Sequence, residues 1–114
     1  MEAVMVLERS DKGVHLIFED QTTRNDAVLK AVPKDFVASA KGDRKGFFLT
    51  GMDGDILYHV YGTFQAEGES GWKKLSVTFT HFRGSERPKS KLYHVVLSFQ
   101  QVEQLLKVLE DHWQ

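Results

Sequence analysis

The sequence has no cysteine, only two prolines and no long apolar run. Without cysteine the chain can form neither a disulfide framework nor a thiolate metal site, which is compatible with a reducing cytosol. The N-terminal stretch up to Gly13 has an early Glu and lacks an apolar segment of the length that a secretory signal or a membrane span needs. We therefore expect a cytoplasmic protein with no membrane contact.

The common catalytic motifs are also missing. No nucleophile elbow, P-loop or dinucleotide-binding fingerprint occurs, and the nine glycines are dispersed in turns. The five histidines are scattered, and no two have metal-ligand spacing on one helix. His59 and His94 form the best acid–base or metal pair, but a histidine on a strand is more often structural. We expect a protein that is not an enzyme and that has neither cofactor nor metal.

The charge of the chain is unevenly distributed. A length of 114 residues, 41% hydrophobic and 27% charged, is typical of one soluble domain, and the net charge is only −1. Residues 1–72 have a balance of −4 and residues 95–114 of −2, whereas residues 73–94 carry six Lys or Arg against Glu86, a balance of +5. A basic block in a near-neutral chain indicates a site for an anionic partner. A solvated loop explains the same block equally well.

Residue patterns predict seven strands and two helices. The strands are expected at residues 3–9, 13–20, 27–32, 47–50, 56–64, 75–83 and 91–97. Pro33 ends the third strand and opens a helix over residues 34–41, with Gly42 at its C-cap. Polar stretches at 21–26 and 51–55 predict turns, and 65–71 predicts a flexible link that is also an internal boundary.

The C-terminal helix has the clearest local signal. Ser98 and Gln101 have the spacing of a capping box, in which each side chain accepts from the other residue's backbone amide. An apolar stripe with helical spacing is expected to be core; it comprises Phe99, Val102, Leu105, Leu106, Leu109 and Trp113. The predicted fold is α+β and a single domain over residues 1–114, with pseudo-repeat units at about 1–42 and 46–114. Each unit is an antiparallel meander plus a helix, with three strands in the first and four in the second, and the last helix packs on the sheet.

One face of the predicted second sheet has an unusual composition. If Val60, Val77 and Phe79 face the core, the opposite pleat carries Thr, His, Tyr and Phe side chains. Aromatic rings beside hydroxyls and cations suit single-stranded nucleic acid, because each stacked base contributes about 1–3 kcal/mol. Ordinary strand formers, or a face buried by a dimer partner, explain the pattern as well.

The predicted binding residues are therefore aromatic, hydroxyl and basic. Tyr61, Phe82 and Trp72 are expected to stack on bases. Six cations are expected to neutralise phosphate: Lys73, Lys74, Arg83, Arg87, Lys89 and Lys91. Thr78, Thr80 and His94 complete the set.

The segments GWKKLSVTFTHFR and KLYHVVLSFQQVEQLL, within residues 71–113, form a strand–strand–helix rhythm. This rhythm resembles the Whirly-type single-stranded-DNA-binding fold and the related units of purine-rich-element-binding proteins. The Whirly segment KGKAALT is absent, so no family-specific residue is carried over. The resemblance implies sheets that hold the nucleic acid and helices that assemble subunits, and hence a homodimer or higher homo-oligomer.

Two functional hypotheses follow. The first is a small non-catalytic protein that binds single-stranded DNA or RNA through the aromatic and hydroxyl face and the basic loop. The second is a protein-interaction module, similar to a pleckstrin-homology-type barrel or a small inhibitor or accessory protein. In that case the loop from Arg83 to Ser90 meets an acidic protein surface.

Overall fold

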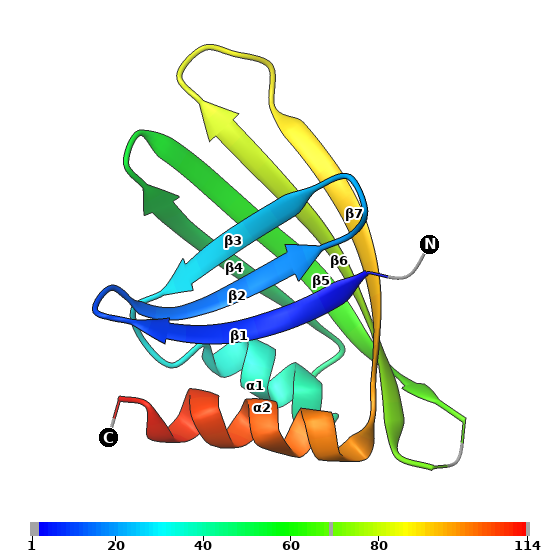
Figure 1. The fold of residues 1–114 in the computed structure, drawn as a ribbon. Coiled ribbons are helices and arrows are strands. Elements are labelled where there is room, and N and C mark those ends of the chain that lie inside the picture. Colours follow the sequence, from blue (N-terminus) through cyan, green and yellow to red (C-terminus); the bar gives the residue numbers. More distant parts are fainter. Residues whose placement is uncertain (1–2, 69, 114) are drawn as a thin grey trace.

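The computed structural model of this chain describes residues 3–68 and 70–113. It contains two antiparallel sheets and two helices (Figure 1), which confirms the predicted α+β class and the order of three strands, helix, four strands and helix. The elements are β1 (Val4–Ser10), β2 (Gly13–Glu19), β3 (Arg24–Leu29), α1 (Lys34–Lys41), β4 (Gly46–Asp53), β5 (Ile56–Glu67), β6 (Trp72–Arg83), β7 (Lys89–Leu97) and α2 (Phe99–Asp111). Neighbouring strands in each sheet follow one another in the sequence.

The core lies between the two sheets, where the three-stranded sheet crosses the four-stranded one (Figure 1). Phe18 of β2 contacts Phe79 of β6 edge-to-face at 6.2 Å and stacks on Tyr93 of β7 at 5.7 Å between ring centroids. Burial of such rings contributes most to a core of this size. The Tyr58 hydroxyl donates to the backbone oxygen of Val28 at 2.6 Å, so hydrogen bonds also join the sheets.

Both helices lie side by side at the end of the sheets opposite the β6–β7 loop (Figure 1). In α1, Phe36 packs against Phe47 of β4 at 4.7 Å, and Gly42 ends the helix with φ +87°, a conformation that favours glycine. In α2, Ser98 and Gln101 form the predicted capping box. The predicted apolar stripe is core at its centre, but Phe99 is 55% exposed, so the prediction was wrong at that position.

Several predicted strand boundaries were wrong. β3 ends at Leu29 and not at residue 32, and β6 and β7 begin at Trp72 and Lys89 and not at residues 75 and 91. Three further differences have a common reason. β3 begins at Arg24, β4 continues to Asp53 and β5 continues to Glu67. The polar residues of these segments predict turns, whereas in the structure they extend the strands; the side chain of Asn25 donates to the hydroxyl of the buried Tyr93 at 2.6 Å. Residues 65–67 therefore belong to a long hairpin and not to a flexible link; the part of that prediction at Glu69 lies outside the described residues.

Candidate binding surfaces

The four-stranded sheet presents two different surfaces because side chains alternate along its strands. β5 and β6 pair continuously from Ile56 with Arg83 to Glu67 with Trp72. The side chains on the inner pleat face the core along most of the sheet. Those on the opposite pleat of β4 to β7 form what we call the outer sheet face. The two strands β6 and β7, with the loop between them, extend past the three-stranded sheet (Figure 1).

The structure divides the twelve predicted binding residues between these surfaces. Seven lie on the outer sheet face: Tyr61, Trp72, Lys74, Thr78, Thr80, Phe82 and His94. Four cations lie on the inner pleat: Lys73, Arg83, Lys89 and Lys91. Arg87 lies in the β6–β7 loop. The predicted stacking residues and most of the predicted phosphate-binding residues are thus on opposite sides of one sheet.

Two of the inner cations are held by other parts of the fold. The Lys73 ammonium donates to the backbone oxygen of Ala40 at 2.7 Å, in the last turn of α1, where carbonyl groups lack helical partners. The Lys91 ammonium lies 3.0 Å from Oδ2 of Asp20. The amide of Thr22, and then Lys91, hold the pKa of Asp20 well below its usual range, so the pair stays ionised. These lysines stabilise the fold.

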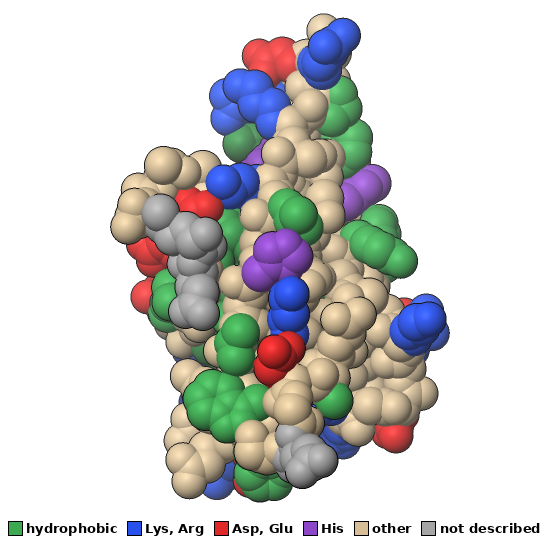
Figure 2. Space-filling view, turned by 90° about the vertical axis from the view of Figure 1, so that its right-hand side faces the viewer, with side chains coloured by type: hydrophobic (Ala, Val, Ile, Leu, Met, Phe, Trp, Pro, Cys, Tyr) green, Lys and Arg blue, Asp and Glu red, His purple; other side chains and the backbone are tan. Residues whose placement is uncertain are grey.

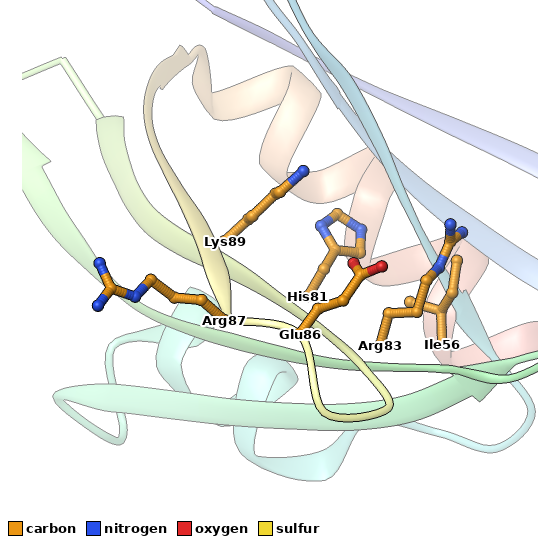
Figure 3. A pocket seen from close by; sticks show the side chains of 6 residues that line it. All are labelled: Ile56, His81, Arg83, Glu86, Arg87 and Lys89. Carbon is orange, nitrogen blue, oxygen red and sulfur yellow. The ribbon is translucent and has the colours of Figure 1, made fainter.

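The remaining inner cations line a concave site at the open end of the sheets. We call this site the hairpin pocket; it has a volume of about 290 Å³ and is lined by Ile56, His81, Arg83, Glu86, Arg87 and Lys89. His81, Arg83 and Lys89 point to the same side of the hairpin, whereas Arg87 points the other way (Figure 3). Glu86 lines the pocket as well (Figure 3).

The hairpin pocket has an excess of uncompensated positive charge. Among the described residues, Arg83, Arg87 and Lys89 take part in no ion pair and no side-chain hydrogen bond. Burial, and then the positive charge of Arg83, lower the pKa of His81 below the ordinary imidazole value. The lowered pKa favours the neutral imidazole of His81, and within the described part of the chain Glu86 is the only acidic side chain that lines the pocket. An anionic group would gain contacts here that the protein itself does not supply.

The outer sheet face is organised in rows that cross the strands. One row runs Phe48–Tyr61–Thr78–Leu92 and the next Thr50–His59–Thr80–Ser90. They are flanked by Met52–Leu57–Phe82 on one side and by Gly46–Thr63–Ser76–His94 on the other. None of these four rows contains Asp, Glu, Lys or Arg. The first charged residues on this face, Lys74 and Glu67, come nearer the helices.

Large apolar side chains in these rows are open to solvent. Tyr61 is 59% exposed, Met52 59%, Leu92 55% and Phe48 48%. The ring of His59 lies 5.0 Å from Phe48 and 4.7 Å from Phe82, centroid to centroid, so the rings of three strands are in contact. Figure 2 shows Lys and Arg side chains gathered at the top, above hydrophobic and His side chains, with further Lys, Arg, Asp and Glu side chains beside and below these. Contiguous exposed apolar area of this kind marks interaction sites.

Sequence reasoning missed residues on both surfaces. His81 and Ile56 share the inner pleat with Phe79 and Val60. Strand alternation puts His81 on one face with Phe79 and Arg83, but neither His81 nor Ile56 was predicted to bind a ligand. Phe48 was missed because the first strand of the second sheet was predicted as a short segment without a role. No sequence signal could have identified Lys73 and Lys91 as structural, since their partners lie far away in the chain.

Among the described residues, no three His, Asp or Glu side chains are grouped so that they could hold a metal ion. None of the helices in residues 3–68 and 70–113 has the length and apolar character needed to cross a membrane. No protein-family model, curated protein or solved structure matches this chain.

Proposed function

We propose that this protein is a non-catalytic interaction module whose hairpin pocket binds an acidic segment of a partner protein. One observation carries the proposal: Arg83 and Lys89 converge on a concave site without an ion-pair partner among the described residues. Carboxylates would satisfy these donors through charge-assisted hydrogen bonds, and Arg83 offers the planar fork that pairs with a carboxylate in bidentate geometry. Ile56 gives the pocket an apolar side for the stem of a glutamate.

The placement of the aromatic residues supports a peptide over a nucleic acid as the ligand of the pocket. Tyr61 and Phe82 lie on the pleat opposite Arg83 and Lys89. A nucleotide strand cannot stack its bases on one side of a sheet while its phosphates occupy a pocket on the other.

The proposal is tested by NMR titration of the labelled protein with a hexaglutamate peptide. At low ionic strength, about 20 mM, amide shifts should be confined to Ile56 and residues 81–89, and they should shrink by about 200 mM salt because the ligand contacts are ionic. The double substitution Arg83→Ser/Lys89→Ser should weaken peptide binding by a factor of at least about ten, because it removes two charge-assisted contacts with the ligand.

A charge-matched control uses Lys12→Ser/Lys107→Ser, which removes two exposed cations outside the pocket. This variant should bind the peptide like the wild type. Equal binding by the pocket variant, or shifts spread over other surfaces, would contradict the proposal. The fingerprint spectrum of each variant reports separately whether the fold is intact.

Single-stranded nucleic acid remains a second candidate, for the outer sheet face. The observation in its favour is the contact of the His59 ring with Phe48 and Phe82 next to the exposed Tyr61, a surface on which bases can stack. Heptathymidylate, whose six phosphates match the charges of hexaglutamate, should then shift Phe48, Tyr61 and Lys74. No shift at low salt would eliminate this candidate.

A further inference from the structure

We infer that the outer sheet face binds the same face of a second copy of this chain, so that the protein is a dimer with its two hairpin pockets turned outward. This inference does not depend on the ligand of the pocket. It rests on the absence of charge from four rows of the face, on the fit of the rows to one another under a two-fold axis, and on the area available.

The first observation is the charge pattern. The outward side chains of the four strands form four rows, and none of these side chains is Asp, Glu, Lys or Arg. The rows run from Met52–Leu57–Phe82 to Gly46–Thr63–Ser76–His94. The chain as a whole is 27% charged, so charge is strongly depleted here. Depletion of charge with enrichment of Tyr, Phe and Met is typical of the buried centre of a protein interface.

The second observation is self-complementarity. A two-fold axis parallel to the strands and between β5 and β6 exchanges β5 with β6 and β4 with β7, and leaves each row opposite itself. The pairing register then sets Tyr61 opposite Thr78 of the second copy, and Phe48 opposite Leu92. A bulky ring thus meets a small side chain in the centre of the contact.

The same axis also determines which charges meet at the helix end of the interface. Lys74 pairs with Gln65 across the strands of its own sheet, and Trp72 with Glu67. In the dimer, Lys74 therefore lies opposite Gln65 of the second copy and one row, about 7 Å, from its Glu67. By the same operation, Lys74 and its own copy lie in one row and one strand spacing, about 4.8 Å, apart along the sheet, as do Glu67 and its copy, so like and unlike charges both meet at this end. A two-fold axis perpendicular to the strands and through the centre of the four rows would instead set the row of Met52 against the row of Gly46, and the row of Thr50 against the row of Phe48.

The third observation is size. Four strands about 4.8 Å apart and four rows about 6.8 Å apart give a face of about 500 Å² per copy, or about 1,000 Å² in the pair. Trp72 and Val96, which are exposed at the helix end of the same face, enlarge this area further. Specific interfaces begin at about this size, so we expect a dimer that dissociates in the micromolar range and packs in the aligned manner of two stacked sheets.

The test is sedimentation equilibrium of the full chain with substitutions at Phe48 and Leu92, which lie opposite each other across the proposed axis. Over about 10 to 500 µM the wild type should pass from monomer to dimer. Phe48→Lys and Leu92→Glu should each remain monomeric, because each puts an unpaired charge into the interface twice. Mixing the two variants should restore a dimer, in which the introduced lysine of one copy meets the introduced glutamate of the other.

A matched control is Val4→Glu, which introduces the same charge at a residue that is also 55% exposed but lies on β1. It should associate like the wild type. The inference would be overturned by a wild type that stays monomeric up to about 500 µM. It would also be overturned by association that survives both single substitutions, or by variants that are folded but do not recover a dimer on mixing. Heptathymidylate binding to a monomeric wild type would assign the face to nucleic acid instead.

Discussion

The hairpin pocket and the outer sheet face lie on opposite sides of the same β6–β7 hairpin and differ in almost every physical property. The pocket is concave and carries three cations without ion-pair partners among the described residues, whereas the outer face has four rows without a formal charge. Arg83 and Phe82 are neighbours in the sequence but belong to different surfaces. The period of two in a strand thus lets one segment serve two ligands of different chemistry.

The largest effect is expected where both surfaces depend on one buried side chain. Phe79 is fully buried, and its ring lies 5.7 Å from that of Tyr58 and 4.9 Å from that of His81. Phe79→Ala should lower the free energy of unfolding by about 3–5 kcal/mol, through lost burial and the cavity left behind. Urea denaturation measures the loss, and peptide binding and dimerisation should disappear together. Phe79→Leu should cost about 1–2 kcal/mol and retain both.

A smaller effect is expected from a hydroxyl that joins the sheets below the pocket. The Tyr93 hydroxyl accepts from the Asn25 amide at 2.6 Å and lies 2.8 Å from the Thr23 hydroxyl. Tyr93→Phe should destabilise the fold by about 1–2 kcal/mol, because the partly buried side chains of Thr23 and Asn25 lose a hydrogen-bond partner. Thermal unfolding checks this value. The dimer dissociation constant should not change, since Tyr93 lies on the inner pleat; a change would show that the two surfaces are coupled.

Ligand binding to the hairpin pocket should also depend on pH through His81, which is not part of the outer sheet face. Arg83, Glu86 and Lys89 line the hairpin pocket together with His81, and Tyr58 lies opposite His81 on β5. Burial and Arg83 lower the pKa of His81, and a bound carboxylate should raise it again. Binding then takes up a proton, so hexaglutamate affinity should rise about threefold to tenfold as the pH falls from 7.5 to 5.5, where the peptide is still ionised. NMR titrations at each pH measure the affinity. In His81→Asn the affinity should depend less on pH. An equally steep pH dependence in that variant would contradict the role given to His81.

The smallest expected difference distinguishes two lysines on the same pleat of β7. Lys89 lines the pocket without an ion pair among the described residues, whereas Lys91 is held by Asp20 at 3.0 Å. Lys89→Met should weaken hexaglutamate binding about threefold to tenfold, and Lys91→Met less than about twofold. The same NMR titration measures both. Equal losses would mean that total charge, and not the pocket, binds the peptide.

The fold was largely predictable because its signals are local. Helix α1 was bounded by Pro33 and Gly42, and α2 by the capping box of Ser98 and Gln101, as the structure confirms. Strand ends were less predictable, because the polar residues that extend β3 and β5 are stabilised by pairing with a neighbouring strand. That pairing depends on residues distant in the sequence and leaves no local pattern.

The candidate sites were predictable in composition but not in arrangement. The cations of residues 73–94 do cluster in the structure, but Lys73 donates to Ala40 and Lys91 pairs with Asp20. The residues of each pair are more than 30 positions apart in the sequence. The alternation that separates Phe82 from Arg83 was readable in the sequence. Its consequence, that rings and cations serve different surfaces, became evident only once both sides of the sheet were seen in place.

The central claim is that the two sides of the β6–β7 hairpin bind independently, and Leu92→Glu tests it most directly. Sedimentation velocity with fluorescent hexaglutamate, at low salt and about 200 µM protein, reports association and peptide binding together. We predict that the peptide sediments with a dimer of the wild type and with a monomer of the variant. The affinity for the peptide should be the same in both. A wild type that is monomeric, or a folded variant that loses the peptide along with the dimer, would contradict the account.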